Sequence, residues 1–143
     1  MAENFVATAG ITIDAQPSVV WEALTEPTLI SRYMFGTEVH TTWRVGDPIT
    51  YRGEWEGAAY EDKGTILDVQ PGKLLKSSYF SAMSGEPDVP ENYRTVTYLL
   101  SEENGQTRVT LTQDNNTTPD AAEHSRQNWE LVLSGLKEVV ERG

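Results

Sequence analysis

The feature that most limits how this chain can fold is a long amphipathic helix predicted over residues 119–142. Thr118, Pro119 and Asp120 give it a hydroxyl cap, a proline at the first helical position and an acid at the positive end of the helix dipole. Apolar residues then recur at helical spacing, so the helix has one face to bury. At ~1.5 Å per residue it is roughly 35 Å long, which is enough to lie across a whole sheet.

Most of the chain before this helix alternates between apolar and polar residues, as β-strands do. The predicted strands are residues 5–14, 37–43, 49–56, 64–70, 74–81, 94–101 and 107–113. Asn104-Gly105 joins the last two strands and is a strong hairpin signal, because a type I′ turn needs positive φ at both central positions. We expect a turn over residues 57–63 and the longest loop over residues 84–91.

Two short helices are predicted directly after the first strand, one opened by Pro17 and the other by Pro27. The order is thus one strand, two short helices, six strands and one long helix. Helices on one face of an antiparallel sheet make an α+β fold of two layers, and a twisted sheet of about seven strands tends to curl. We therefore expect one domain, residues 1–143, in which a curved antiparallel sheet surrounds the C-terminal helix and leaves room for a ligand cavity.

Charge and composition exclude several kinds of partner. The chain has 22 acidic and 11 basic residues, a net charge of −11, so we expect no nucleic acid and no anionic membrane bound through charge. Cysteine is absent, and two isolated histidines, His40 and His124, fall short of a metal site, so we expect no metal and no cofactor. No apolar run is long enough for a membrane span and no signal peptide begins the chain, so we expect a cytoplasmic protein without membrane insertion.

No common catalytic signature is present: the sequence has no G-x-S-x-G, H-E-x-x-H, G-x-G-x-x-G or P-loop motif. His40 or His124 could serve as a general base, but an isolated histidine is more often an ordinary exposed residue. The pair Glu54 and Glu56 fits a solvated sheet face better than a catalytic cleft. We therefore predict no catalytic residues.

Aromatic side chains are spread over most of the predicted elements. Tyrosine and tryptophan have polar tips that need partners when buried, so a core rich in them is typical of a cavity lined with a few polar groups. By alternation Tyr51 and Trp55 share one strand face, and Trp129 lies on the apolar stripe of the long helix. Plain core packing is the alternative for any one of these residues.

Several motifs together resemble the helix-grip superfamily, which includes START-like, Bet v 1-like and polyketide cyclase domains. VWEALTEP at residues 20–27 is similar to a VWxALTxP stretch of that superfamily. Other pieces resemble its branch of Hsp90-ATPase-activator C-terminal-domain-like proteins. They are WRVGD at 43–47, GEW at 53–55, GTILDVQP at 64–71, TVTY at 95–98, TRVTLT at 107–112 and the final helix through Asn128, Trp129, Leu133, Leu136 and Lys137.

This resemblance covers about residues 5–141 and implies a helix-grip fold with a hydrophobic cavity between the sheet and the C-terminal helix. Tyr33-Met34 stands where many members have Trp-Phe, and Asn128 stands where many have glycine; both positions are expected to border the cavity. The predicted ligand-binding residues are Trp21, Tyr33, Phe35, Tyr51, Trp55, Tyr79, Tyr98, Asn128, Trp129 and Leu133.

Three functions remain open at this point. The aromatic residues and the resemblance favour binding of a small hydrophobic or amphipathic molecule, such as a lipid, by a monomer or weak dimer. A cofactor-independent cyclase, dehydratase or hydrolase could use the same cavity, and a titratable side chain there within hydrogen-bond reach of a polar group would favour it. The third is contact with an Hsp90-type chaperone. The sequence does not identify the ligand.

Overall fold

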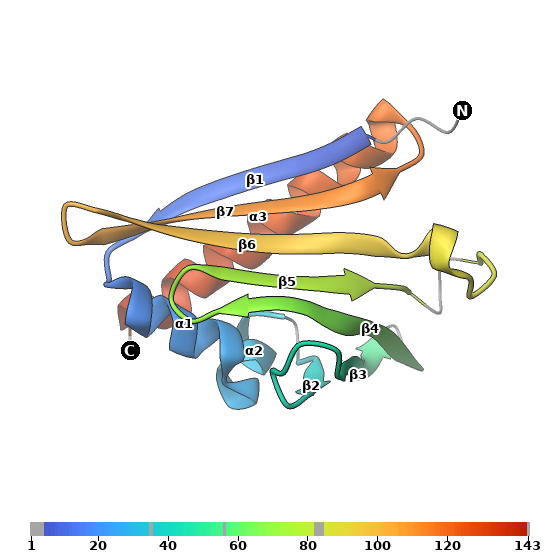
Figure 1. Ribbon diagram of the computed structural model, residues 1–143, viewed down its shortest axis with the longest axis horizontal. Coiled ribbons are helices and arrows are strands. Elements are labelled where there is room, and N and C mark those ends of the chain that lie inside the picture. The colour runs from blue at the N-terminus through green and yellow to red at the C-terminus, as the bar shows by residue number, and fades with distance from the viewer. Residues whose placement is uncertain (1–4, 35, 56, 82–84, 143) are drawn as a thin grey trace.

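Seven antiparallel strands form one curved sheet in the computed structural model, which describes residues 5–34, 36–55, 57–81 and 85–142 (Figure 1). The strands are β1 (Phe5–Ile13), β2 (Glu38–His40), β3 (Pro48–Trp55), β4 (Ala58–Gln70), β5 (Leu74–Tyr79), β6 (Arg94–Glu103) and β7 (Gln106–Asn116). They lie in the order β1-β7-β6-β5-β4-β3-β2. The first strand therefore pairs with the last, which joins the two ends of the chain in one sheet.

Helices α1 (Pro17–Thr25) and α2 (Pro27–Tyr33) follow β1, and α3 (Pro119–Arg142) follows β7. A 3-10 turn, η2 (Pro90–Asn92), precedes β6. Helix α3 runs along the sheet, packs against β1 and β7, and also contacts α1 and α2 (Figure 1). The predicted α+β order is confirmed, with both proline-led helices and the long final helix in their expected places. In the described part of the chain, no helix is both long enough and apolar enough to span a membrane.

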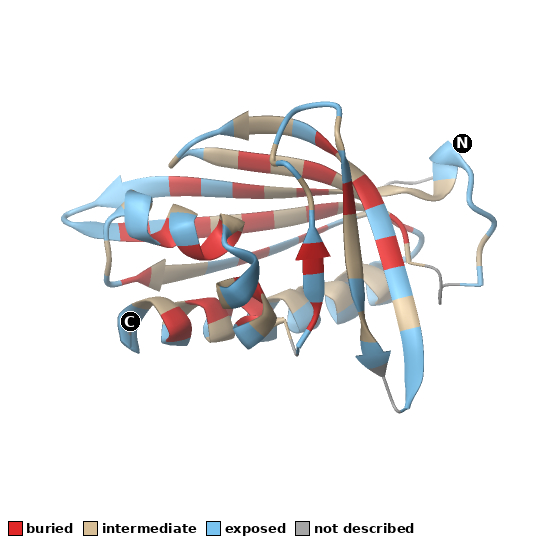
Figure 2. Ribbon diagram, turned by 90° about the horizontal axis from the view of Figure 1, so that it is seen from below, coloured by how far each residue is buried: buried red, intermediate tan, exposed pale blue. Residues whose placement is uncertain are grey.

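The apolar core lies where the inner face of the sheet meets the helices (Figure 2). Strand β7 shows how the sequence builds it: residues alternate so that Val109 and Leu111 are fully buried while Arg108 is exposed. Leu133 and Leu136 of α3 are 1% and 0% exposed. They supply the helical side of the same core, as the spacing of apolar residues in the sequence predicts.

The turn predicted over residues 57–63 is wrong, because β4 begins at Ala58 and runs for 13 residues. Its first half pairs with β3, from Ala58 opposite Trp55 to Lys63 opposite Thr50. Apolar alternation gives no signal here because the side chains that face inward are polar or aromatic, such as Asp62. Gly57, directly before β4, has a φ of 82°, a left-handed value that suits glycine.

Strand β2 is shorter than the strand predicted over residues 37–43, since it covers only Glu38–His40. Trp43 takes a left-handed conformation, with φ of 61°, which ends the extended run. Thr42 Oγ1 donates a hydrogen bond to Asp47 Oδ2 over 2.5 Å and holds the chain in this local turn before β3. Trp43 is partly buried and packs against the core.

Candidate functional site

A cavity of about 430 Å³ lies between the inner face of the sheet and the helices. This volume is in the range of sites that enclose small organic molecules. Among the described residues, every helix and every strand except β1 contributes to its wall. The apolar part of the wall includes Leu24, Ile30, Ile49, Leu75, Val96 and Val132.

Strand alternation explains which side chains reach the cavity. Leu75, Ser77 and Tyr79 follow at every second position of β5, and Val96 and Tyr98 do the same on β6. Because β5 and β6 are neighbours at the centre of the sheet, these side chains form a continuous floor.

Six of the ten predicted ligand-binding residues line this cavity: Tyr33, Tyr51, Tyr79, Tyr98, Asn128 and Trp129. Trp21 and Leu133 are not among the lining residues. Trp21 packs partly buried against the core, and Leu133 points into it, one residue further round α3 than Val132. Phe35 lies outside the described residues, and for Trp55 only the backbone is described.

A buried pair of polar side chains, Asp62 and Tyr79, lies in the cavity wall. The Tyr79 hydroxyl donates to Asp62 Oδ2 over 2.5 Å, and Asp62 is only 8% exposed. Tyr51 meets Tyr79 edge to face, with ring centroids 5.6 Å apart. Sequence reasoning missed Asp62 and Ser77. A strand assignment that included residues 60–66 would have placed Asp62 on the same face as buried Ile66.

Two glycines, one on β3 and one on α3, each leave space for a tyrosine of the cavity. A Cβ on Gly53 would come 2.6 Å from the Tyr60 hydroxyl, so glycine leaves space for this ring, whose oxygen lies 2.6 Å from Thr37 Oγ1. A Cβ on Gly135 of α3 would lie 3.0 Å from the Tyr33 Cβ. Glycine at this point lets α2 approach α3 closely.

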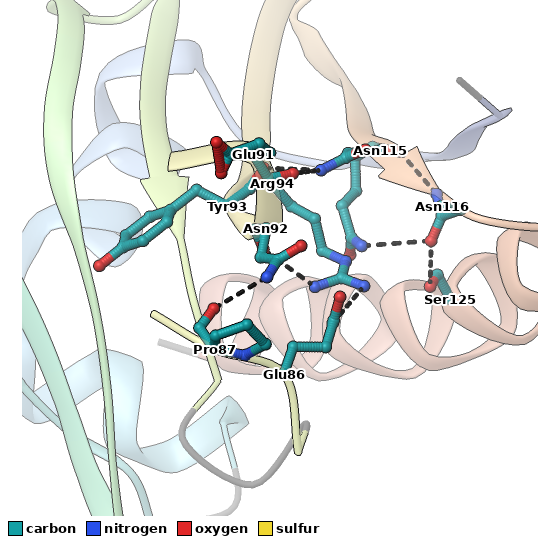
Figure 3. A network of polar contacts seen from close by, with 10 residues as sticks. Glu86, Pro87, Glu91, Asn92, Tyr93, Arg94, Asn115, Asn116 and Ser125 are labelled. Carbon is teal, nitrogen blue, oxygen red and sulfur yellow. Dashed lines mark hydrogen bonds and ion pairs between the residues drawn. The ribbon is translucent and has the colours of Figure 1, made fainter. Parts of the chain in front are cut away.

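A polar network near the start of α3 fixes Trp129. The indole Nε1–H donates to Gln113 Oε1 over 2.6 Å, and Gln113 is 7% exposed. Asn116 donates from Nδ2 to the Gln113 carbonyl over 3.1 Å and accepts at Oδ1 from the Ser125 hydroxyl over 3.0 Å. Figure 3 shows this link between β7 and α3 beside Asn115. The helix and the sheet are therefore tied together at the end of the cavity that Trp129 borders.

The hydroxyls of four tyrosines in the cavity wall, Tyr33, Tyr51, Tyr79 and Tyr98, are protonated at neutral pH. Burial raises the pKa of Tyr33 and Tyr98 well above the usual value, and that of Tyr79 also, with the hydrogen bond to Asp62 as a second cause. Burial raises the pKa of Tyr51 to about 12. These groups can therefore serve as hydrogen-bond donors inside the cavity.

Alkaline pH is expected to destabilise the fold between about pH 10 and pH 12. An unfolded tyrosine loses its proton near pH 10, whereas burial raises the pKa of Tyr51 to about 12. The stabilisation is complete below about pH 10 and is lost as the pH rises through the folded value, and for Tyr51 it amounts to about 3 kcal/mol. Urea unfolding from about pH 8 to pH 12 should show this loss, and Tyr51→Phe should reduce it. An unfolding free energy that stays level over that window would contradict the burial of these hydroxyls.

The ionisable groups in the cavity wall are acidic. Asp62 is buried, and Glu54 is exposed but borders the cavity at its rim. None of the described lining residues is a lysine, arginine or histidine. His40 and His124 are both exposed and lie outside the wall, and no group of metal-ligating side chains occurs among the residues described.

Comparison with known proteins places these features in a family. The sequence profile described as Activator of Hsp90 ATPase homolog 1-like protein matches residues 14–141. The protein ChR145 from Cytophaga hutchinsonii is 44% identical, with a TM-score of 0.86 over 99% of this chain and 97% of that one. Among curated proteins, none matches this sequence.

More distant structures share the fold alone. The Aha1 dimer from Colwellia psychrerythraea has a TM-score of 0.73 at 20% identity, over 96% of each chain. Ara h 8.0201 has a TM-score of 0.77 at 9% identity, over 99% of this chain and 100% of that one. The predicted helix-grip fold is confirmed by these similarities.

Proposed function

This chain belongs to the activator of Hsp90 ATPase homolog 1-like family, and we propose that it binds one small hydrophobic or amphipathic molecule in the cavity between the curved sheet and α3. The observation that carries this proposal is the cavity of about 430 Å³ with a mostly apolar wall. Each Å² of apolar ligand surface removed from water there contributes about 25 cal/mol. A few polar groups among apolar side chains are typical of small-molecule sites, where they orient the ligand.

Within this proposal, the six lining residues of the predicted set are the ligand contacts. Trp129 is held by its hydrogen bond to Gln113, and Tyr51 and Tyr79 brace one another, so these aromatic faces are oriented before the ligand arrives. Such preorganisation lowers the entropy lost on binding. Trp21 and Leu133 do not contact the ligand directly; they belong to the packing of the core around the cavity. Contacts with Phe35 and Trp55 remain predictions from the sequence.

Titration with Nile red, an uncharged dye, tests the proposal. We expect its emission to shift to the blue on binding, with one dye per chain by native mass spectrometry, because the proposed site between the sheet and α3 has room for one molecule. Displacement by a panel of small apolar molecules then ranks ligand classes. An emission unchanged at saturating protein, together with no displacement over the panel, would remove the proposal.

A reaction without a cofactor is the second candidate, and the Asp62–Tyr79 pair favours it. A carboxylate in the wall within hydrogen-bond distance of a tyrosine hydroxyl is the arrangement that acid–base chemistry needs. Asp62→Asn keeps the size of the side chain and removes the carboxylate. Turnover of a 4-nitrophenyl ester that is lost in this variant would support the candidate, and equal rates in both proteins would argue against it.

The proposal that this chain binds a protein partner comes from the family match and not from the cavity. The family description names an activator of Hsp90 ATPase, and one structural neighbour is a dimer. The predicted contact with an Hsp90-type chaperone and the predicted monomer or weak dimer are therefore kept as proposals. Sedimentation at rising concentration, with and without the host chaperone, tests both. A cytoplasmic location also remains a prediction.

A further inference from the structure

Tyr98 differs from the other tyrosines of the cavity in having an unpaired hydroxyl. Its ring lies on β6, it is 7% exposed, and its hydroxyl has no hydrogen-bond partner among the described residues. Three other tyrosines that line the cavity have hydrogen-bond partners. Tyr33 donates to the Ala23 carbonyl, Tyr60 pairs with Thr37 and Tyr79 donates to Asp62.

An unpaired buried hydroxyl is unfavourable unless something else in the cavity completes its hydrogen bond. Tyr98 is flanked on the sheet by Leu75 of β5 and Leu111 of β7, which offer it no polar side chain. Since burial keeps the phenol protonated, its O–H is a donor for which the described residues supply no acceptor. A ligand can supply that acceptor because Tyr98 lines the cavity.

Charge narrows the ligand class further. Asp62 is buried in the wall and Glu54 borders it, and none of the described lining residues carries a cationic side chain. A ligand carboxylate would therefore lose its hydration and approach like charges in a medium of low dielectric, with no cation to pair with. An uncharged polar group avoids this cost.

From these observations we propose that the cavity selects an uncharged ligand whose carbonyl or hydroxyl oxygen accepts a hydrogen bond from Tyr98, and that it excludes carboxylates. This inference rests on the proposed function, since it concerns the same cavity. It makes Tyr98 the residue that determines the polar specificity of the site, with Asp62 as the residue that rejects anions.

Three probes that share one apolar body test the inference by equilibrium dialysis: 2-acetonaphthone, 2-ethylnaphthalene and 2-naphthoate. We expect the ratio of ketone affinity to hydrocarbon affinity to fall about tenfold in Tyr98→Phe, because the variant loses the donor. Tyr93→Phe removes a hydroxyl that pairs with Asp88 outside the cavity wall, and it should leave the ratio as in the native protein.

The comparison of naphthoate with the ketone uses the native protein, so its result is valid even if Tyr98→Phe folds poorly. We expect naphthoate to bind on the order of 100-fold more weakly than the ketone, and Asp62→Asn to recover about tenfold of that difference. The inference is wrong if the hydrocarbon and the ketone both bind but the ratio of their affinities is the same in Tyr98→Phe as in the native protein. It is also wrong if naphthoate binds the native protein as tightly as the ketone does. In either case the proposed function stands. If none of the three probes binds, the proposed function itself fails.

Discussion

Replacing Val96 by tryptophan is expected to weaken Nile red binding at least about 100-fold while lowering the free energy of unfolding by less than about 1 kcal/mol. Val96 is 5% exposed on β6 and its side chain belongs to the cavity floor, between Ser77 of β5 and Gln113 of β7. A larger side chain there extends into the cavity instead of into packed atoms. It therefore occupies the volume that a ligand needs, without forcing the core apart.

Val109→Trp is the matched control. Val109 lies on the adjacent strand β7 and is 0% exposed, but it is not part of the cavity wall. Inserting an indole into a closely packed site costs about 3 kcal/mol or more, because backbone and side chains must move. Urea unfolding and dye titration of both variants give the comparison. Equal destabilisation by the two tryptophans would mean that the floor at Val96 is as densely packed as the rest of the core.

Replacing Gly64 by alanine is expected to destabilise the protein by about 4 kcal/mol, a large part of the stability of a domain this size. A Cβ at this position would lie 1.8 Å from the Ser78 carbonyl oxygen and 2.6 Å from the Ser78 carbonyl carbon. Both atoms belong to the backbone of β5, so no side-chain rotation relieves the clash. The strands must separate where Lys63 and Phe80 exchange two backbone hydrogen bonds, 3.0 and 2.7 Å long.

Gly72→Ala separates this steric effect from backbone strain. Gly72 has a φ of 76°, and a Cβ added there would meet no described atom within 4 Å, so alanine adds only the strain of a left-handed conformation, about 1 kcal/mol. Chemical unfolding of both variants measures the difference. A loss at Gly64 no larger than the loss at Gly72 would show that the backbones of β4 and β5 are further apart than these distances require.

The order of elements could be predicted because each one leaves a local signal. Pro17, Pro27 and Pro119 each open a helix, and the hairpin turn at Asn104-Gly105 has the expected positive φ at both positions, 52° and 83°. The cap signature at residues 118–120 predicted where α3 begins, and hydrophobic spacing predicted its course, because a helix that covers a sheet must keep one apolar face.

The polar part of the cavity could not be predicted, because it depends on contacts between distant strands. Asp62 lies in the first half of β4, where apolar and polar residues do not alternate, and its hydrogen-bond partner Tyr79 is 17 positions away on β5. Alternation does place Tyr98 on the inner face of β6. Alternation does not show that the Tyr98 hydroxyl lacks a hydrogen-bond partner, because this depends on which side chains of the neighbouring strands and helices lie near its oxygen.

The most direct test of the central claim is a set of isotope-filtered nuclear Overhauser effects between bound 2-acetonaphthone and the methyl groups of the protein. A ligand enclosed between the sheet and α3 should give contacts to Leu75, Val96 and Val132, which line the cavity on three different elements. Contacts confined to exposed methyl groups such as those of Leu99 and Leu131, with none to the three cavity residues at saturation, would show that the ligand binds outside and would contradict the account.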